Sequence, residues 1–191
     1  MFSKKIILGS SSPRRKQLIE QLGINCEIRK KEVDEVYPTE ISNYDVPEYL
    51  SQLKAEPLKN TILKDEVLLT SDTVVIHNNQ ILEKPKDHNA AVEMLQRLSG
   101  SINEVVTGVY LYHPTKEKTF SVRTKVFFKV LSLEEIEYYV SNYKPFDKAG
   151  AYGIQEWIGM IGVEKIEGCF YNVMGLPMNE LWKAINEDFM F

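Results

Sequence analysis

Short apolar runs separated by polar stretches predict alternating strands and helices in the first half of the chain. Residues 5–9 (KIILG) form a continuous apolar run, which is typical of a short buried strand. The stretch from Pro13 to Leu22 has helical apolar periodicity, with Ser12 suited to cap its start and Gly23 to follow its end. The elements expected next are a strand at 25–30, a polar loop at 31–44, and a helix near 46–62 that Pro57 should kink or split.

The second half opens with a strong strand pattern at residues 67–77, where β-branched residues dominate, and Asn78-Asn79 predicts a turn after it. The elements expected beyond this turn are a short strand at 80–83, a helix from Asp87 to Gly100, strands at 104–112 and 119–131 joined by a turn at 114–118, a helix from the capping box at Ser132–Glu135 to about Ser141, a loop at 144–155, a strand at 160–167 and a helix at 177–187. Because several strands follow one another directly, we expect a mixed α/β fold with a mixed sheet.

Composition and charge indicate a globular protein and argue against broad nucleic-acid binding. The 191 residues suit one domain, or one domain with a small lobe, and a hydrophobic content of 43% is enough for a core. The formal net charge of −4 is unlike that of phosphate-backbone binders, which usually show a basic excess. A local pocket for a small anion stays compatible with this charge, since it needs only a few basic side chains.

The cysteines and histidines predict a reduced, cytoplasmic protein without a structural zinc site. The two cysteines, Cys26 and Cys169, are far apart, and the three histidines lack the spacing of a helical metal site. The apolar run at residues 6–8 is too short for a signal peptide core or a membrane span. We therefore expect no membrane association.

The segment Ser10-Ser11-Ser12-Pro13-Arg14-Arg15 lies between a predicted strand and the start of a helix. Backbone N–H groups at a helix N-terminus attract anions, serine hydroxyls add donors, and arginines bind phosphate bidentately. The segment is therefore a candidate phosphate site. The alternative is a capped helix with two solvated arginines.

Carboxylates at two places suggest metal or acid–base chemistry. Asp72 interrupts an apolar strand, where a buried carboxylate is costly unless it is paired or metal-bound. It is either a general base or metal ligand, or an aspartate at a bulge that accepts backbone hydrogen bonds. Glu32, Asp34 and Glu35 form an acidic cluster whose oxygens suit Mg²⁺, and the alternative is a solvated acidic loop.

Three further features are candidates for substrate binding, although the sequence pattern around each is weaker evidence. Lys54 on a predicted helix and Lys84 before Pro85 are each able to neutralise a phosphate, although single lysines are usually surface charges. Residues 147–155 (DKAGAYGIQ) form a loop of small residues that ends in an amide and allows a ligand to approach its backbone. An ordinary connecting loop is the alternative.

Taken together, these segments resemble the Maf family. The matching motifs run in order from Ser10 to Pro177: residues 10–15 (SSSPRR), 34–35 (DE), 54–55 (KA), 71–75 (SDTVV), 83–85 (EKP), 98–100 (LSG), 107–109 (TGV), 147–155 (DKAGAYGIQ) and 172–177 (NVMGLP). Their number, order and spacing make the resemblance specific.

The resemblance implies a nucleotide pyrophosphatase that depends on Mg²⁺ or Mn²⁺ and cuts a nucleoside triphosphate to monophosphate and pyrophosphate. It implies a single domain over residues 1–191, with two lobes around a cleft as a variant, an elongated mixed sheet flanked by helices, a central cleft and a relation to inosine triphosphatases. A homodimer fits the family. The implied substrates are dTTP and UTP, with modified pyrimidine nucleotides as further candidates.

The motif matches also imply individual roles. Asp72 corresponds to the family's catalytic proton acceptor, with Glu35 and Asp72 as metal ligands. The implied substrate-binding residues handle the phosphates or separate substrate subgroups: Ser10, Arg15, Lys54 and Lys84 in the first role, and Arg14, Thr73 and Gln155 in the second.

Two departures and two alternatives accompany the resemblance. Asn103 stands where the family often has histidine, and it hydrogen-bonds but carries no proton at neutral pH. Pro57 lies in the helix that bears Lys54 and leaves the aim of that side chain open. The alternative functions are a non-catalytic regulator of cell division, and a pyrophosphatase for purine or modified nucleotides such as 7-methyl-GTP.

Overall fold

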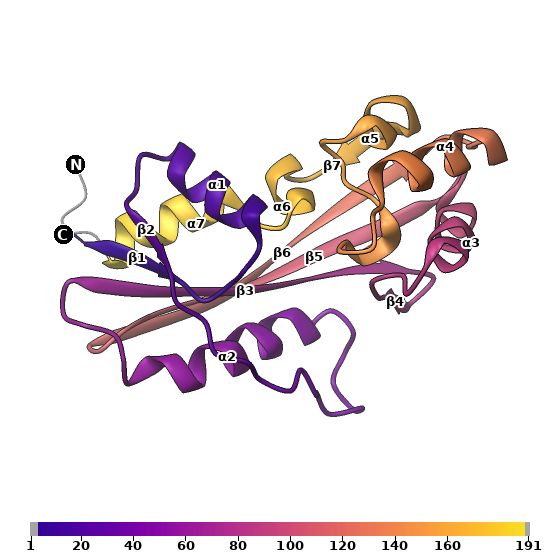
Figure 1. Ribbon diagram of the computed structural model, residues 1–191. Helices are drawn as coiled ribbons and strands as arrows, with labels where there is room; N and C mark the ends of the chain where they lie inside the picture. The colour runs from indigo at the N-terminus through magenta and orange to yellow at the C-terminus, as the bar shows by residue number, and fades with distance from the viewer. Residues whose placement is uncertain (1–3, 190–191) are drawn as a thin grey trace. The chain divides into compact units, whose positions relative to one another are not determined.

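The structure, a computed structural model, describes residues 4–189 and has a mixed α/β fold (Figure 1). The strands are β1 Lys5–Leu8, β2 Cys26–Ile28, β3 Glu66–His77, β4 Gln80–Leu82, β5 Ile102–His113, β6 Lys116–Phe128 and β7 Val163–Glu167. The helices are α1 Pro13–Gln21, α2 Val46–Lys59, α3 His88–Leu98, α4 Leu133–Tyr143, α5 Trp157–Gly162, α6 Phe170–Met174 and α7 Met178–Ala184. Within residues 4–189, none of these helices is long and apolar enough to cross a bilayer.

Seven strands form one mixed sheet, which confirms the predicted fold class. The strand order is β2-β1-β3-β5-β6-β7, and β4 pairs with β3 outside this path. β1 runs parallel to both β2 and β3, whereas β4 is antiparallel to β3 and β7 is antiparallel to β6. A parallel half and an antiparallel half therefore share the sheet.

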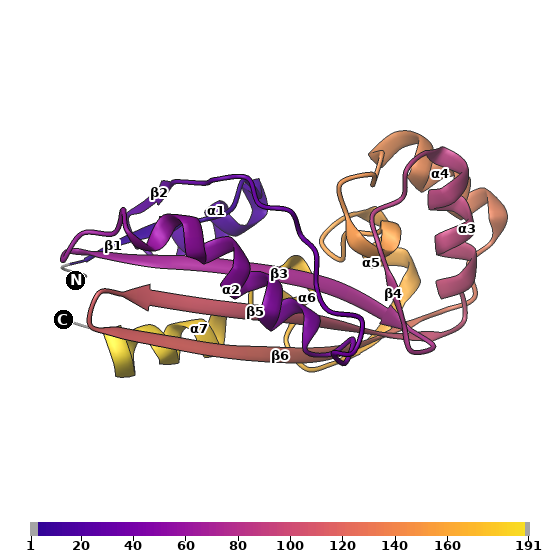
Figure 2. The same ribbon diagram turned by 90° about the horizontal axis from the view of Figure 1, so that it is seen from below.

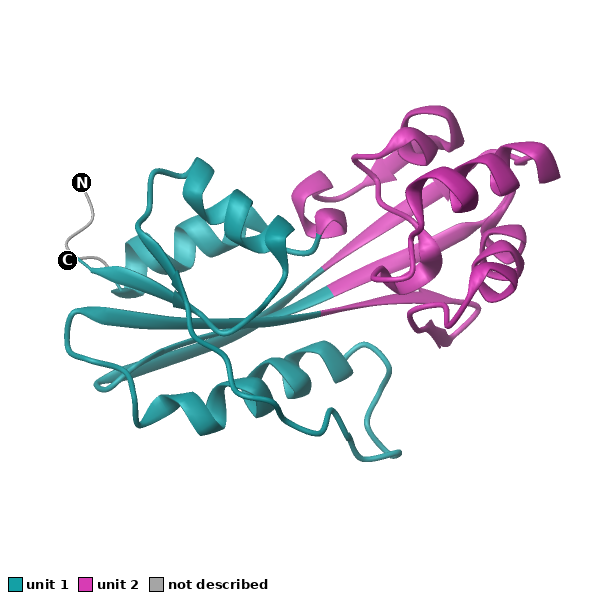
Figure 3. Cartoon of the chain, viewed as in Figure 1, with its two compact units in different colours: residues 1–72, 107–122, 175–191 teal, residues 73–106, 123–174 magenta. Residues whose placement is uncertain are grey.

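The chain divides into two compact units, which Figure 3 shows in different colours. Unit 1 consists of residues 1–72, 107–122 and 175–191, and unit 2 of residues 73–106 and 123–174. The strands β3, β5 and β6 contribute residues to both units. The predictions of a single domain and of a cleft stay predictions.

In unit 1, the helix α2 packs on the sheet through an apolar cluster. Ala55, Leu58 and Ile62 contact Ile7 and Leu68, and all of them are buried. In Figures 1 and 2, α2 lies on one face of the sheet, and α1 and α7 lie on the other. Because side chains alternate along a strand, the residues of β3 that share the face of Leu68 also point toward α2.

The start of α2 lies unusually close to β5. A Cβ atom built on Gly108 would come within 2.2 Å of the carbonyl carbon of Pro47 and 2.3 Å of the amide nitrogen of Glu48. Pro47 lies in the first helical turn, where a missing N–H leaves no helical bond unmade. Only glycine at position 108 permits this backbone contact.

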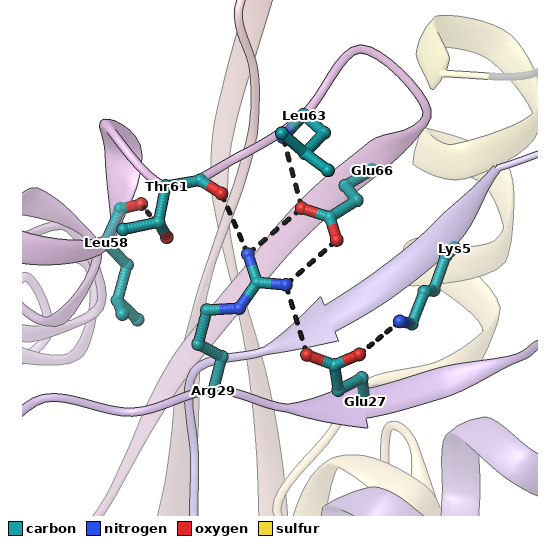
Figure 4. Close-up of polar contacts among 7 residues, drawn as sticks. All are labelled: Lys5, Glu27, Arg29, Leu58, Thr61, Leu63 and Glu66. Atoms are coloured by element: carbon teal, nitrogen blue, oxygen red, sulfur yellow. Dashed lines mark hydrogen bonds and ion pairs between the residues drawn. The ribbon is translucent and has the colours of Figure 1, made fainter.

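The other end of α2 is joined to the sheet by a partly buried ion pair, shown in Figure 4. Arg29 donates two hydrogen bonds to the Glu66 carboxylate, at 2.9 and 3.0 Å, and a third at 2.9 Å to the carbonyl of Thr61. Glu66 also accepts from the backbone N–H of Leu63 at 3.1 Å. A second carboxylate, Glu27, bridges Arg29 to Lys5. The end of β2, the segment after α2 and the start of β3 are thus held together.

Unit 2 has its own core beneath α3, α4 and α5. The buried side chains that form it include Val75, Leu95, Val126, Ile136 and Ile158. The turn at Asn78 and Asn79 has positive φ at both residues, as a two-residue hairpin requires, and joins β3 to β4 as predicted.

Several predicted elements need correction. The strand expected at 160–167 begins only at Val163, because residues 157–162 continue as the helix α5, and α6 was not predicted. Of the predicted kink or split of α2 at Pro57, the split is wrong, because the helix runs unbroken to Lys59 and a proline in the last turn removes only one helical bond. The kink stays a prediction. The strands β5 and β6 extend further into their turn than predicted.

The Arg29–Glu66 pair yields a prediction about stability and pH. Hydrogen bonds from Arg29 are the main reason that the pKa of Glu66 lies below its ordinary value of 4.5, and burial opposes them. The stabilisation is therefore fully present above pH 4.5 and is lost as the pH falls through the lower folded-state pKa. Arg29→Met should cost about 3 kcal/mol at pH 7, and this cost should shrink on acidification below that range.

Urea unfolding at pH 7 and below pH 4 measures both costs. Lys165→Met is the matched control, because its partner Glu167 is exposed and surface pairs contribute at most about 1 kcal/mol. An Arg29→Met cost that does not change between the two pH values would contradict the assignment.

The contact at Gly108 yields a second prediction. Gly108→Ala should destabilise the protein by about 3 kcal/mol or more, because the new methyl group meets backbone atoms of α2 that have no rotamer to move into. Gly23→Ala is the comparison: Gly23 has φ of +73° but nothing within 4 Å of the position that an alanine methyl group would take, so only backbone strain of about 1 kcal/mol is expected. Equal losses in the free energy of unfolding for the two variants would contradict the close contact between Gly108 and the backbone of α2.

Candidate active site

The loop between β1 and α1 is held by its own serines. The Ser12 hydroxyl caps α1 by accepting a hydrogen bond from the Arg15 backbone N–H at 3.4 Å. The Ser10 hydroxyl accepts one from the Ser12 backbone N–H at 3.2 Å. This confirms the predicted capped helix, and it shapes residues 10–12 around the start of α1.

The Arg15 side chain of α1 contacts three other segments of unit 1. Its Nε donates to the carbonyl of Gly175 at 2.9 Å, and its Nη1 donates to the carbonyl of Ser71 at 2.8 Å and to the Ser10 hydroxyl at 3.3 Å. Burial lowers the pKa of the Arg15 guanidinium, and Asp72 is the largest opposing influence. The guanidinium stays charged and ties three distant segments together beside Asp72.

Lys54, Asp72 and Glu35 form the centre of the candidate site in unit 1. The Lys54 ammonium lies 2.5 Å from an Asp72 carboxylate oxygen and 2.9 Å from a Glu35 carboxylate oxygen. The Lys54 and Asp72 side chains are 17% and 13% exposed, while Glu35 is 53% exposed. One cationic group is therefore shared by two carboxylates, one sheltered and one open to solvent.

The local sequence explains why these three residues meet. Asp72 lies on the face of β3 that points toward α2, two residues after Thr70, whose hydroxyl donates to the carbonyl of Ser51 in α2 at 2.6 Å. Lys54 lies three residues after Ser51 on the helix and so projects from nearby. Glu35 comes from the irregular segment between β2 and α2.

The two carboxylates suit a hard divalent cation. Glu35 and Asp72 both contact the same ammonium group, so their oxygens converge on one cation position. Among residues 4–189, no group of three or more histidine, cysteine or acidic side chains is placed to hold a metal. A pair of carboxylates is typical of Mg²⁺ or Mn²⁺ sites, in which water and substrate phosphates complete the coordination.

Arg14 lies in the first turn of α1, half-buried, and is close enough to Arg15 to lower the pKa of that guanidinium. The structure thus brings together six of the predicted residues within unit 1: Ser10, Arg14, Arg15, Glu35, Lys54 and Asp72.

The other three predicted residues belong to unit 2. Thr73 follows Asp72 in β3 and is half-buried. Lys84 is exposed, and Gln155 is exposed at the end of the small-residue loop. The backbone N–H of Gly150 donates to the carbonyl of Glu83 at 3.3 Å, so the loop and the segment bearing Lys84 lie side by side within unit 2.

Asn103 has a structural place in unit 2. It is buried, and its side-chain oxygen accepts a hydrogen bond from the Tyr152 hydroxyl at 2.9 Å while its amide donates to the carbonyl of Val126 at 3.4 Å. Burial raises the pKa of Tyr152, so the phenol keeps the proton that it donates. The asparagine is thereby satisfied inside the core.

Sequence reasoning missed a charged cluster in the loop. Lys148, taken only as part of a small-residue loop, is buried and pairs with Asp147 at 2.8 Å and with Glu156 at 3.1 Å. Tyr139 of α4 also bonds to Glu156. The sequence signal for this cluster was the presence of charged residues at both ends of the small-residue loop, Asp147 and Lys148 before it and Glu156 after it.

Cys26 and Cys169 are both free cysteines. Burial, with a smaller contribution from Glu20, raises the pKa of Cys26 to about 11. Its thiol is therefore protonated and unreactive at neutral pH.

Comparison with known proteins identifies the family. A dTTP/UTP pyrophosphatase of Cytophaga hutchinsonii is 48% identical over 96% of this chain and 84% of its own length. One from Bacteroides thetaiotaomicron is also 48% identical, over 96% of this chain and 95% of its own length. A solved dITP/XTP pyrophosphatase from Mycobacterium abscessus is 18% identical with a TM-score of 0.40, covering 65% of this chain and 72% of that one. Residues 5–188 match the family described as Maf-like protein, and the chain belongs to the Maf family.

Proposed function

We propose that the protein hydrolyses dTTP and UTP to the nucleoside monophosphate and pyrophosphate. The observation that carries this proposal is the convergence of Lys54, Asp72 and Glu35 in unit 1, at positions where the family motifs stand. Relatives about half identical in sequence are named dTTP/UTP pyrophosphatases, which supports the same substrates here. From the family resemblance we further propose that the protein acts in the cytoplasm and that it forms a homodimer. Light scattering, which measures the molecular mass in solution, tests the homodimer.

In the proposed reaction, a water oxygen bonds to the α-phosphorus while the bond from that phosphorus to the bridging oxygen breaks. Pyrophosphate leaves with the bonding electron pair, and Asp72 accepts the proton of the attacking water. General base catalysis of this kind contributes roughly 10²–10⁴-fold. Asp72 suits the role because its side chain is mostly sheltered yet still reachable by water.

The basic and hydroxyl groups bind the triphosphate. In unit 1, Ser10, Arg14 and Lys54 donate to phosphate oxygens, and losing one well-aimed donor typically costs about 3–4 kcal/mol in the transition state. For Lys84 of unit 2, the family resemblance alone supports a phosphate-binding role. Arg15 has a second role besides adding positive charge. Its guanidinium makes three hydrogen bonds to protein atoms, so it also positions Ser10 and the β3 backbone at Ser71.

Glu35 and Asp72 are the residues that would hold Mg²⁺ or Mn²⁺. The bound cation would offset negative charge on the phosphates. Glu35 is the more exposed of the two carboxylates and lies in an irregular segment, so it is able to take up a cation without moving a strand or helix.

Base recognition is proposed for Gln155 of unit 2, and the family resemblance supports a part in substrate selection for Arg14 and for Thr73. A glutamine amide has a donor and an acceptor that match the N3–H and a neighbouring carbonyl of uracil or thymine. Although dTTP and UTP differ in the 5-methyl group of the base and in the 2′-hydroxyl of the sugar, both present this same base edge, so an amide that reads it should accept both. Purine triphosphates, which present a different edge, should be much poorer.

Incubation with a nucleotide panel and Mn²⁺, followed by detection of monophosphate and pyrophosphate, tests the proposal. We expect turnover of dTTP and UTP, and a loss of at least about 10² in Asp72→Asn, because an amide does not accept the proton. Asp65→Asn, in the exposed segment before β3, is the matched control. An Asp72→Asn variant that keeps more than about a tenth of the activity shows that Asp72 is not the base. Absence of any turnover by the wild-type protein supports the alternative function, a non-catalytic regulator of cell division.

The Lys54 contacts give a prediction about metal binding. The Lys54 ammonium contacts both carboxylates that are proposed to hold the metal, so it competes with a divalent cation for Glu35 and Asp72. Removing this charge in Lys54→Met should tighten Mn²⁺ binding by about tenfold or more, since a unit charge at 4 Å is worth a few kcal/mol near a protein surface. Hydrolysis should fall at the same time, because a phosphate donor is lost.

Calorimetric titration of nucleotide-free protein with Mn²⁺ measures this change. Lys59→Met on the same helix removes an ammonium that contacts Glu56 instead and should leave the Mn²⁺ affinity unaltered. If Lys54→Met binds Mn²⁺ no better than the wild type, then Glu35 and Asp72 are not the metal ligands.

A further inference from the structure

Gln155 lies in a four-residue turn, residues 153–156, whose first and last residues are joined by hydrogen bonds. The backbone N–H of Glu156 donates to the carbonyl of Gly153 at 3.0 Å, so Ile154 and Gln155 are the central residues of the turn. Ile154 is buried and Gln155 is exposed. The turn therefore presents one side chain, an amide, to the outside while its neighbour anchors it in the core of unit 2.

A single buried hydroxyl joins the first and last residues of this turn. The Tyr139 hydroxyl accepts a hydrogen bond from the backbone N–H of Gly153 at 3.0 Å and donates one to the carboxylate of Glu156. Tyr139 is fully buried on α4, so the hydroxyl has a fixed position. Burial, and next the Glu156 carboxylate, raise the pKa of Tyr139, which keeps its proton available for donation.

The second oxygen of Glu156 is also engaged. Lys148, whose side chain is only 9% exposed, places its ammonium 3.1 Å from Glu156 Oε1 and 2.8 Å from Asp147 Oδ1. Tyr139 takes Oε2. With both oxygens bound from different directions, the Glu156 carboxylate is held in one orientation.

The side chains of Glu156 and Gln155 both lie close to Gly153. A Cβ atom built on Gly153 would lie 2.7 Å from Glu156 Cδ and 3.1 Å from Gln155 Nε2. Both side chains thus pack against the same glycine of the turn. Because Tyr139 holds the first and last residues of this turn, a change that releases Glu156 loosens the turn that bears the Gln155 amide.

We propose that Tyr139, Glu156 and Lys148 form a positioning network that fixes the Gln155 amide and thereby sets nucleotide specificity without touching the nucleotide. This inference rests on the proposed role of Gln155 in base recognition. An amide reads a base only if its donor and acceptor face the right way, and a rotation by half a turn exchanges them. The network supplies the fixed orientation that such recognition needs.

The test compares Tyr139→Phe with the wild type in the ratio of kcat/KM for UTP to that for ATP. We expect the ratio to fall by about tenfold, the effect of losing one hydrogen-bonded support. In a Gln155→Ala background the same substitution should change the ratio no further, because the amide that it orients is gone. Tyr143→Phe is the matched control: this ring stacks on Tyr139 at 5.1 Å between ring centroids and is partly exposed.

A nucleotide-free measurement separates this inference from the proposed function. The side-chain NH₂ resonances of Gln155, assigned by their absence in Gln155→Ala, should shift or broaden in Tyr139→Phe and in Glu156→Gln but not in Tyr143→Phe. Unchanged resonances in both network variants overturn the inference, whatever the enzyme hydrolyses. An unchanged UTP preference in Tyr139→Phe, when Gln155→Ala loses that preference, overturns it as well. Failure of the wild type to hydrolyse UTP and dTTP refutes the proposed function, and the resonances then still report on the network.

Discussion

The contact between Gly108 and the backbone of Pro47 is the constraint on which the arrangement of unit 1 depends. It brings the first turn of α2 against the sheet without an intervening side chain, while the Arg29–Glu66 pair holds the segment that follows the helix. A helix fixed at both ends is unable to slide or tilt. Lys54, midway along it, therefore stays above Asp72, and the chemistry proposed for these residues follows from backbone packing.

Lys54 in unit 1 and Lys148 in unit 2 each lie between two carboxylates, with opposite consequences. In unit 1, Lys54 joins Asp72 to the half-exposed Glu35, so solvent and ions reach the arrangement and the ammonium is exchangeable for another cation. In unit 2, Lys148 is buried against Glu156, which a buried tyrosine also holds. Breaking a buried pair leaves an uncompensated charge, so the second arrangement is suited to fixing a turn.

The features that could be predicted from the sequence are those that short segments determine. Ser12 caps α1, Asn78 and Asn79 form the hairpin turn, and Ser132 with Glu135 forms the capping box, because each needs only neighbouring residues. The helix α5 was missed because residues 157–162 are as apolar as a strand and their helical state depends on packing in unit 2. Family motifs indicated Lys54, Asp72 and Glu35, but the shared ammonium, the contacts of Arg15 to Ser71 and Gly175, and the Tyr139 network are long-range and visible only in the fold.

The contact of Arg15 with Gly175 has a consequence for the order in which the protein is made. Arg15 lies near the beginning of the chain, and its partner belongs to the last segment of unit 1, which starts at residue 175. All of unit 2 is synthesised before that segment, and domains generally fold as units during synthesis. Unit 2 is thus able to fold while unit 1 still lacks α7 and the carbonyl that orients Arg15. A chain truncated before residue 175 therefore carries every proposed catalytic side chain and yet lacks the carbonyl that orients Arg15.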